Sequence, residues 1–163
     1  DAVTKAGGTM KGLQYALKGE PRMAEKIEDK AGKYGITRKE YAARLGDALR
    51  YTAVLGEDDH LYAKGVTQTL AEMESKGYQF TAKENKWKDP NYRGLHYTMI
   101  TPNGVQAELQ FHTPASLDAK ENGRHQIYEQ LRVAKDPVHT RTLFDKLKDI
   151  WGNVMPPPGV FSF

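Results

Sequence analysis

The chain has 163 residues, no cysteine and a net charge of +3. The lack of cysteine excludes a disulfide framework, thiol catalysis and thiolate metal sites. No apolar run approaches the roughly 20 residues of a membrane helix, so we expect no membrane contact. A hydrophobic content of 39% fits a globular chain with one core. The small excess of positive charge is compatible with phosphate ligands without identifying them.

The ends of the chain differ in composition from its middle. The chain opens on Asp1 rather than Met, and residues 1–10 are small and Gly-rich, so we expect the remnant of a linker in a longer protein. Residues 11–155 mix helical and strand-like patterns and predict a single domain. Residues 156–163 begin with consecutive prolines and predict an extended tail.

A helical pattern runs from residue 11 to about residue 33, and Pro21 either separates two helices or opens the second. Lys18, Arg22 and Lys26 recur every four residues, which would align them as a cationic stripe on one helix. Such a stripe is either a solvated helix face or a phosphate clamp, and the spacing alone leaves both possibilities open.

The next pattern is a helix followed by a strand. Thr37, with Glu40 three residues later, resembles a capping box and predicts a helix that ends near Gly46. The β-prone run 47–55 follows, with Asp47 at its leading edge. A carboxylate at that position either caps a turn or serves a site.

Residues 61–76 predict an amphipathic helix that ends at Gly77, and residues 78–81 predict a short strand. A basic loop interrupted by an aromatic residue comes next. Its members are Lys83, Lys86, Trp87 and Lys88. This loop is either a solvated charged segment or an anion site.

Residues 92–113 predict a β-hairpin with the turn Thr101-Pro102-Asn103-Gly104. Polar and apolar residues alternate in its second strand, so Glu108, Gln110 and His112 share one face. This polar row is either solvated or the floor of a site, and composition alone favours the solvated face.

The loop length of the hairpin decides which polar residues meet. A three-residue loop at 102–104 places Thr98 opposite Glu108. The same register places His96 opposite Gln110. A two-residue Asn-Gly loop would shift the register by one and separate the two strands' polar residues.

Thr113 and Pro114 predict the start of another helix, which Asp136-Pro137 ends. Residues 138–151 predict a last amphipathic helix. His125, inside the first of these helices, is by itself more typical of a packed or surface histidine than of a functional one.

The hairpin carries two polar signatures of a known family. Tyr92-x-Gly94-Leu95-His96 resembles the Tyr-x-Ser-Leu-His motif of the RelA/SpoT-type alarmone synthetases. Glu108-x-Gln110-x-His112-Thr113 resembles their Glu-x-Gln-x-Arg-Thr motif. The two departures are Gly94 for Ser and His112 for Arg.

The resemblance extends over roughly residues 18–128. Lys18-x3-Arg22-x3-Lys26 is similar to the family's ATP-binding Lys-x3-Ser-x3-Lys segment, and Asp47 stands where the family has its metal-holding Asp. Residues 119–128 resemble the family's Ala-Glu-x-Gly-x-Ala-Ala-His-x-x-Tyr segment if a one-residue gap is allowed.

The resemblance implies an α/β fold, a nucleotidyltransferase-like mixed sheet flanked by helices, which the order of predicted elements fits. It implies transfer of the β,γ-pyrophosphate of ATP to a nucleotide 3′-hydroxyl. It also implies that Asp47 and Glu108 hold Mg²⁺ and that Glu108 takes the 3′-OH proton, because Mg²⁺ prefers carboxylate oxygens.

The resemblance also implies substrate contacts. These involve Lys18, Arg22 and Lys26 for the donor triphosphate, Lys83, Lys86 and Lys88 for the acceptor phosphates, and His96, Gln110 and His125 around them. Tyr92 would stack on the acceptor base. The two arginines that sandwich the donor adenine in the family are replaced by Ala16 and Thr52, and Arg50, Arg22 or Arg44 could substitute for them.

Within the family, the chain is similar to the toxin domains of type VI secretion effectors that convert adenosine nucleotides to (p)ppApp and drain ATP. This implies an ATP donor, an AMP, ADP or ATP acceptor, a cognate immunity protein, and action in the cytoplasm of a target bacterium. Alternative acceptors are GDP or GTP, and the 3′ end of tRNA. A degenerate, non-enzymatic nucleotide-binding module would be expected to lack Asp47 or Glu108, and both are present.

Overall fold

A five-stranded mixed sheet forms the centre of the computed structural model, which describes residues 2–11, 20–38, 41, 49–57 and 61–163. The strand order is β1-β2-β5-β4-β3. The strands are β1 (Thr9–Lys11), β2 (Arg50–Val54), β3 (Gln79–Asn85), β4 (Leu95–Ile100) and β5 (Gln106–His112). β2 and β5 are parallel, and the other neighbours are antiparallel. The predicted α/β fold with a mixed sheet is therefore confirmed.

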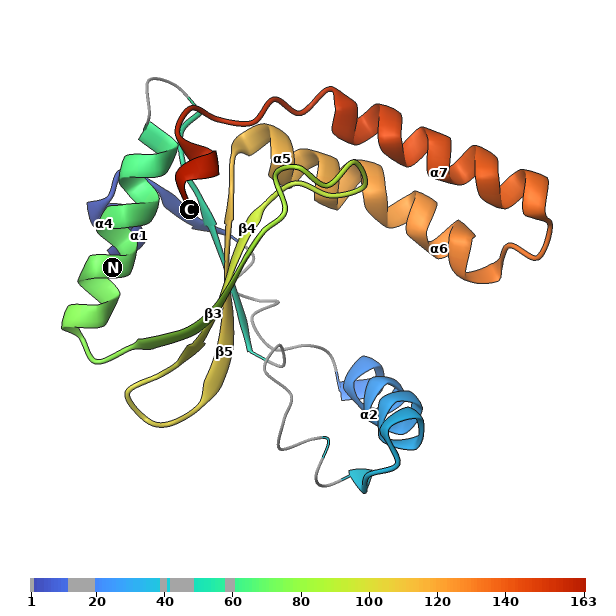
Figure 1. Ribbon diagram of the computed structural model, residues 1–163, viewed down its shortest axis with the longest axis horizontal. Coiled ribbons are helices and arrows are strands. Elements are labelled where there is room, and N and C mark those ends of the chain that lie inside the picture. Colours follow the sequence, from blue (N-terminus) through green and yellow to red (C-terminus); the bar gives the residue numbers. More distant parts are fainter. Residues whose placement is uncertain (1, 12–19, 39–40, 42–48, 58–60) are drawn as a thin grey trace.

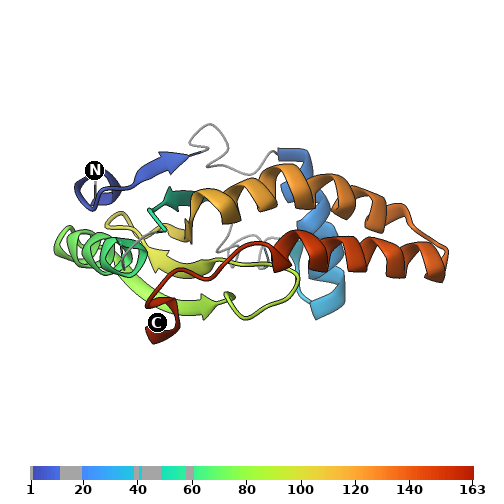
Figure 2. The ribbon, with the colours of Figure 1, turned by 90° about the horizontal axis from the view of Figure 1, so that it is seen from above.

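Helices lie on both sides of the sheet (Figures 1 and 2). On one side lie α1 (Ala2–Lys5) and α4 (Leu61–Ser75). On the other side lie α2 (Glu20–Tyr34), α6 (His125–Val133) and α7 (Pro137–Gly152). The short α5 (Pro114–Asp118) and the π-helix η2 (Ala119–Arg124) lead from β5 into α6. None of the helices that the structure describes has the length and apolar composition needed to cross a membrane.

The main core lies between the sheet and α4. Ala107, Leu109 and Phe111 alternate along β5 and are buried on this core face. Tyr62 of α4 is fully buried, and its hydroxyl donates to the carbonyl oxygen of Phe111 at 2.9 Å. The Trp87 indole N–H donates to the same hydroxyl at 3.2 Å. A hydrogen-bonded, T-shaped pair of buried aromatic rings therefore fixes α4 and the β3–β4 connection on the sheet.

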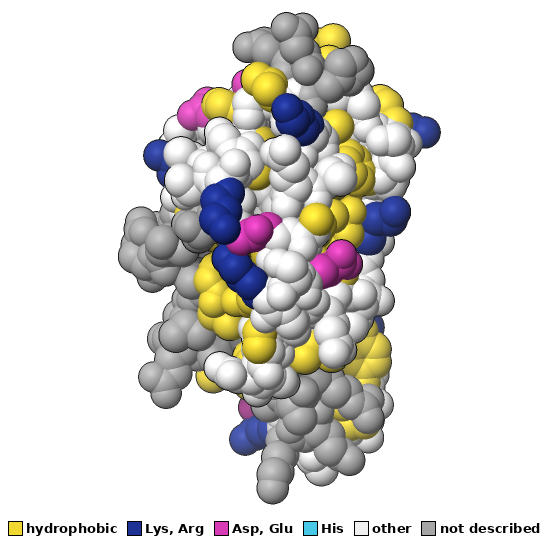
Figure 3. Space-filling view, turned by 90° about the vertical axis from the view of Figure 1, so that its left-hand side faces the viewer, with side chains coloured by type: hydrophobic (Ala, Val, Ile, Leu, Met, Phe, Trp, Pro, Cys, Tyr) yellow, Lys and Arg dark blue, Asp and Glu magenta, His cyan; other side chains and the backbone are white. Residues whose placement is uncertain are grey.

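The outer surface on the α4 side is mixed in character. Figure 3 shows Lys, Arg, Asp and Glu side chains scattered among hydrophobic ones on this face. Glu72 of α4 pairs with Lys5 at 2.6 Å and with Lys76 at 3.0 Å. These hydrogen bonds lower the pKa of Glu72 to about 2. Such exposed pairs tie α1 to α4 but contribute little to stability.

The predicted hairpin forms with the three-residue loop. The backbone N–H of Thr101 donates to Val105 at 2.8 Å, and Gly104 has φ of 78°, the left-handed conformation that this loop requires. Thr98 lies opposite Glu108, and His96 lies opposite Gln110. The two polar signatures therefore share one face, as the three-residue alternative predicted.

The N-terminal segment differs from the predicted linker remnant. Residues 2–11 form α1 and β1, β1 pairs with β2, and Val3 is only 3% exposed. The position of Gly8 requires a residue without a side chain, because a Cβ atom there would lie 2.8 Å from the carbonyl oxygen of Val54 and would overlap Leu55. Glycines that suggested flexibility in the sequence thus allow the close approach of β1 to β2.

The C-terminal tail also packs on the body. Val160 opens a short 3-10 helix, η3 (Val160–Ser162), and is fully buried in the main core. The side-chain amide of Asn85 donates to the carbonyl oxygen of Val160 at 2.8 Å. The predicted extended tail therefore ends in a short 3-10 helix that packs on the body of the domain.

The other described element boundaries follow the prediction with one difference. The helix predicted at 61–76 appears as α4, and the strand predicted at 47–55 appears as β2, whereas most of the helix predicted between Thr37 and Gly46 lies outside the described residues. β3 continues to Asn85, beyond the short strand predicted at 78–81, because pairing with β4 extends it. Pro21 is the second residue of α2, as the second alternative predicted.

Candidate active site

Three neighbouring strands bring polar side chains to the sheet face opposite the core face. On β5 these are Glu108, Gln110 and His112. The register places His96 of β4 on the same face. Arg50 of β2 lies directly opposite Glu108 in the parallel pair, and the backbone N–H of Glu108 donates to the carbonyl of Leu49 at 2.9 Å. This polar face is therefore largely buried rather than solvated, and it is the candidate floor of a site.

Glu108 is the centre of this arrangement, and its side chain is 13% exposed. Arg50 donates through Nε and Nη2 to Oε2 at 3.1 and 3.0 Å. Nδ1 of His96 lies 3.1 Å from Oε1, and Gln110 donates to Oε1 at 2.5 Å. Both carboxylate oxygens are thus fixed by partners from all three strands.

The electrostatics favour an ionised Glu108 beside a neutral His96. Burial alone would raise the pKa of Glu108, but the hydrogen bond from His96, the charge of Arg50 and the hydrogen bond from Gln110 together lower it well below its ordinary value. Burial lowers the pKa of His96, although Glu108 partly opposes this. The His96–Glu108 contact is therefore a hydrogen bond from a neutral imidazole to a carboxylate.

Gln110 links Glu108 to a helix. Its side-chain oxygen accepts a hydrogen bond from Nζ of Lys120 at 2.5 Å, while its amide donates to Glu108. Lys120 belongs to η2, where the sequence predicted no functional residue. The signal that could have found it is the one-residue gap in the family pattern at residues 119–128, because a π-helix accommodates one extra residue within a helix and commonly occurs at functional sites.

Gly123 allows this π-helix to pack closely on α7. A Cβ atom on Gly123 would lie 2.8 Å from Cγ2 of Ile150. Behind this contact, Ile127, Leu143 and Leu147 form a small core between α6 and α7. Each fully buried leucine contributes about 1.5–3 kcal/mol. The helical hairpin is therefore a stable support for Lys120.

Tyr92 does not present its ring for base stacking, which corrects the role expected from the resemblance. The ring is 7% exposed and packs against His96, His112 and Trp151. Its hydroxyl lies 2.8 Å from Nε2 of His96 and 3.0 Å from Nε2 of His112. The inward orientation of the ring gives the hydroxyl these two partners.

The three predicted acceptor lysines separate in the structure. Lys86 lies 6.0 Å from the centre of the Tyr92 ring and pairs with Glu84 at 2.8 Å. Lys83 is a residue of β3 opposite Tyr97, so it faces away from the Glu108 side of the sheet. Lys88 lies over the Phe161 ring at 5.2 Å. Of the three, Lys86 is the one that the structure brings to this site.

The donor-side predictions lie largely outside the described residues. Lys18 and Asp47 are not among those residues. Arg22 and Lys26 belong to α2, four residues apart, and His125 is the first residue of α6. For these three, the structure describes the backbone position alone.

Comparison with known proteins identifies the fold. No family model matches the chain, and no curated protein matches it. The solved structure of the type VI effector Tas1, in complex with its immunity protein, is 21% identical, with a TM-score of 0.56, over 92% of this chain and 83% of that one. Small alarmone synthetases 1 and 2 from Bacillus subtilis match with TM-scores of 0.57 and 0.59, at 14% and 18% identity. They cover 88% and 89% of this chain, and 72% of each synthetase.

The chain has the alarmone synthetase fold. The mixed sheet expected from the resemblance is therefore confirmed, and the structure places the strand with the Glu-x-Gln residues, β5, at its centre.

Of the two carboxylates expected to hold magnesium, only Glu108 lies among the described residues. No group of three His, Asp or Glu side chains with metal-binding geometry occurs among the described residues. Mg²⁺ usually takes only one or two protein carboxylates and completes its shell with water and substrate phosphates. The Glu108 carboxylate could be one such ligand only after a partner such as Arg50 leaves it, because in this structure its oxygens are contacted by Arg50, His96 and Gln110. Asp47, three residues before Arg50 in the sequence, is the candidate for the other ligand.

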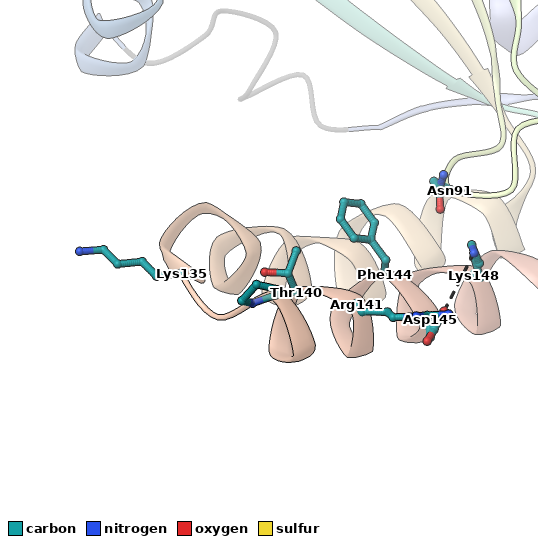
Figure 4. Close-up of a pocket in the computed structure, with 8 residues that line it drawn as sticks. Asn91, Lys135, Thr140, Arg141, Phe144, Asp145 and Lys148 are labelled. Carbon is teal, nitrogen blue, oxygen red and sulfur yellow. Dashed lines mark ion pairs between the residues drawn. The ribbon is translucent and has the colours of Figure 1, made fainter.

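A separate hollow of about 590 Å³ lies along α7. Figure 4 shows that its side chains come mainly from α7, with Asn91 at one end. Arg141, Phe144 and Lys148 are among them, and Lys148 pairs with Asp145 at 4.0 Å. The hollow contains none of the side chains that contact Glu108, so it is not the candidate active site.

Proposed function

We propose that this chain is a pyrophosphokinase that transfers the β,γ-pyrophosphate of ATP to the 3′-hydroxyl of AMP, ADP or ATP, producing (p)ppApp. The observation that carries the proposal is the Glu108 carboxylate, held on the sheet face by contacts with Arg50, His96 and Gln110. The alarmone synthetase fold around it supports the reaction class.

In the proposed reaction, the acceptor 3′-oxygen forms a bond to the β-phosphorus of ATP, the bridging bond to the α-phosphate breaks, and AMP leaves. Glu108 takes the 3′-OH proton. The low pKa of Glu108 makes it a modest base, so fixed orientation must supply much of its effect. Mg²⁺, held by Glu108 and Asp47, would neutralise donor phosphate charge.

The remaining polar residues have proposed roles around this centre. Lys18, Arg22 and Lys26 bind the donor triphosphate. Lys86 is the candidate for the acceptor phosphates. Arg50 remains a candidate for the donor nucleotide, but it must leave Oε2 of Glu108 before it can stack on a base.

The choice of an adenosine acceptor is supported by how the chain departs from the family pattern. Tyr92 is buried, and Gly94 and His112 replace the family's Ser and Arg. These changes alter the acceptor side of the site. A guanosine acceptor or the 3′ end of tRNA remains as an outcome of the test.

The test supplies purified protein with Mg²⁺, ATP labelled at the γ-phosphate, and ADP, GDP or tRNA in turn. We expect labelled product to form fastest with ADP, with one AMP released for each transfer. Faster transfer to GDP or tRNA would overturn the acceptor choice. AMP release without any labelled acceptor would overturn the transfer reaction itself, and an inert protein would favour a nucleotide-binding module.

We also propose that the chain acts as a toxin in the cytoplasm of a target bacterium and has a cognate immunity protein. The fold match to Tas1, a type VI effector solved with its immunity protein, supports this. Expression in a bacterium should deplete ATP and arrest growth, and Glu108→Gln should relieve the arrest. Growth arrest that is equally strong with the variant would contradict a toxic enzymatic activity.

A further inference from the structure

A line of hydrogen-bonded side chains leads from Glu108 into the protein interior. His96 Nδ1 lies 3.1 Å from Glu108, and His96 Nε2 lies 2.8 Å from the Tyr92 hydroxyl. That hydroxyl lies 3.0 Å from Nε2 of His112, and Nδ1 of His112 lies 2.9 Å from Oγ of Ser116. His112 and Ser116 are fully buried. No step of the proposed transfer uses the last three side chains of this line.

When His96 is neutral, the protons along this line have one consistent arrangement. A carboxylate can only accept, so Nδ1 of His96 must carry a hydrogen. In a neutral imidazole, Nε2 is then an acceptor, and the Tyr92 hydroxyl must donate to it. The Tyr92 oxygen is left to accept, which requires a hydrogen on Nε2 of His112.

The end of the line completes the same arrangement. Nδ1 of His112 is then an acceptor, and the Ser116 hydroxyl can donate to it at 2.9 Å. The backbone N–H of Thr113 donates to that hydroxyl oxygen at 2.9 Å. The carbonyl of Thr113, at 3.2 Å, is a longer alternative acceptor for the hydroxyl proton. Every donor in the line thus points toward Glu108.

Packing holds the rings in this order. The Tyr92 ring lies at steep angles of 82° and 84° to the rings of His96 and His112. Gly94 leaves room for the line, since a Cβ atom there would lie 2.9 Å from His112 Cε1 and 3.2 Å from Tyr92 Cε1. The line therefore depends on both departures from the family pattern, Gly94 and His112.

We propose that Tyr92, His112 and Ser116 are positioning residues that hold His96 in the tautomer with a hydrogen on Nδ1, directed at Glu108. They thereby fix the orientation of the carboxylate that takes the 3′-OH proton. The catalytic part of this inference rests on the proposed function, whereas the tautomer is a property of the ligand-free protein.

The test compares Tyr92→Phe with Tyr97→Phe. The first removes the central hydroxyl and keeps the packed ring. The second removes a hydroxyl from the other face of β4 and is the matched control. ¹⁵N NMR of the histidine rings in the ligand-free protein should show His96 protonated on Nδ1 in the wild type and in Tyr97→Phe. In Tyr92→Phe, Nε2 of His96 loses its donor and only Glu108 still favours a hydrogen on Nδ1, so the His96 resonances should shift toward a mixture of tautomers.

Activity provides the second readout. Tyr92→Phe should lower kcat by roughly ten- to a hundredfold with little change in KM, which is the range for removing a partner that orients a catalytic group. Tyr97→Phe should retain wild-type kcat. An equal loss in both variants would indicate a general structural effect and overturn the positioning role.

A second pair of variants covers the case in which Tyr92→Phe does not fold. His112→Gln keeps an amide donor near the position of Nε2, whereas His112→Leu removes it. The His112→Gln variant should preserve the His96 tautomer, and the His112→Leu variant should lose it. A wild-type His96 protonated on Nε2 would overturn the inference, even if the enzyme transfers pyrophosphate normally. An inactive wild type with the expected tautomer would overturn the proposed function and the catalytic part of the inference, and would leave the tautomer assignment established.

Discussion

Gly94 and His112 occupy one confined space, because a Cβ atom on residue 94 would lie 2.9 Å from Cε1 of His112. These are the two positions at which the hairpin signatures depart from the RelA/SpoT-type pattern. The buried imidazole takes the room that a side chain at residue 94 would need. The two departures are therefore one structural change rather than two independent ones.

This coupling predicts a non-additive pair of mutations. Gly94→Ala should lower the free energy of unfolding by about 1–3 kcal/mol, because it overpacks the space beside His112. In a His112→Ala background the same change should cost less, since the ring is gone. Urea unfolding of the two single variants and the double variant measures the difference. Strictly additive effects would show that the two positions do not share a space.

Arg50 should control the ionisation of Glu108. Its guanidinium donates twice to Oε2, and its positive charge is one of the causes that lower the pKa of Glu108. Arg50→Ala should therefore raise that pKa toward its ordinary value. ¹³C NMR of the carboxyl group across an acid titration measures it directly, with Arg141→Ala on α7 as the control. An unchanged pKa in Arg50→Ala would contradict the assigned contact.

The buried histidines predict a pH dependence of stability. Burial lowers the pKa of His96, and lowers that of His112 more strongly. Unfolded histidines titrate near about pH 6.5, so below that pH the unfolded chain binds protons that the folded chain does not. Stability should therefore fall as the pH falls below about 6.5, by about 1.4 kcal/mol per pH unit for each histidine that stays neutral.

Urea unfolding between about pH 8 and pH 5 measures this slope, in a window above most carboxylate titrations. His112→Gln removes one of the two groups. The slope of stability against pH should therefore become shallower by about 1.4 kcal/mol per pH unit, which corresponds to one proton. A slope identical to that of the wild type would mean that His112 is protonated in the folded protein.

Two helix glycines should respond in opposite directions to alanine. Gly152, at the end of α7, has nothing within 4 Å of the added Cβ atom, so Gly152→Ala should be neutral or stabilising by up to about 1 kcal/mol. Gly123→Ala should instead destabilise by about 1–3 kcal/mol, because its Cβ atom would meet Ile150. Thermal unfolding of both variants compares them. A stabilised Gly123→Ala would contradict the close packing of η2 on α7.

The hairpin could be predicted from the sequence, with its register reduced to two alternatives, because local chemistry determines them. Pro102 and Gly104 suit one loop geometry, and the alternation in β5 determines which side chains face the core. The choice between two loop lengths still needed the structure. Once the three-residue loop formed, the meeting of Glu108 with His96 followed from strand geometry alone.

Other features could not be predicted because distant residues decide them. The direction of Lys83 depends on pairing with β4 across the sheet, and the direction of Tyr92 depends on two histidines and Trp151. Gly8 suggests flexibility in the sequence, because its packing against Leu55, which is distant in the chain, is visible only in the structure. Lys120 reaches Gln110 from a π-helix whose extra residue appeared in the sequence as a gap.

The central claim is that Glu108 takes the proton of the acceptor 3′-hydroxyl, and Glu108→Gln tests it most directly. Glu74→Gln is the control, because Glu74 is an exposed residue of α4, on the opposite side of the sheet from Glu108. Transfer of labelled pyrophosphate from ATP to ADP should fall at least about a hundredfold in Glu108→Gln and remain near wild type in Glu74→Gln. Both variants should keep the wild-type circular dichroism spectrum. Wild-type transfer by a folded Glu108→Gln would contradict the account.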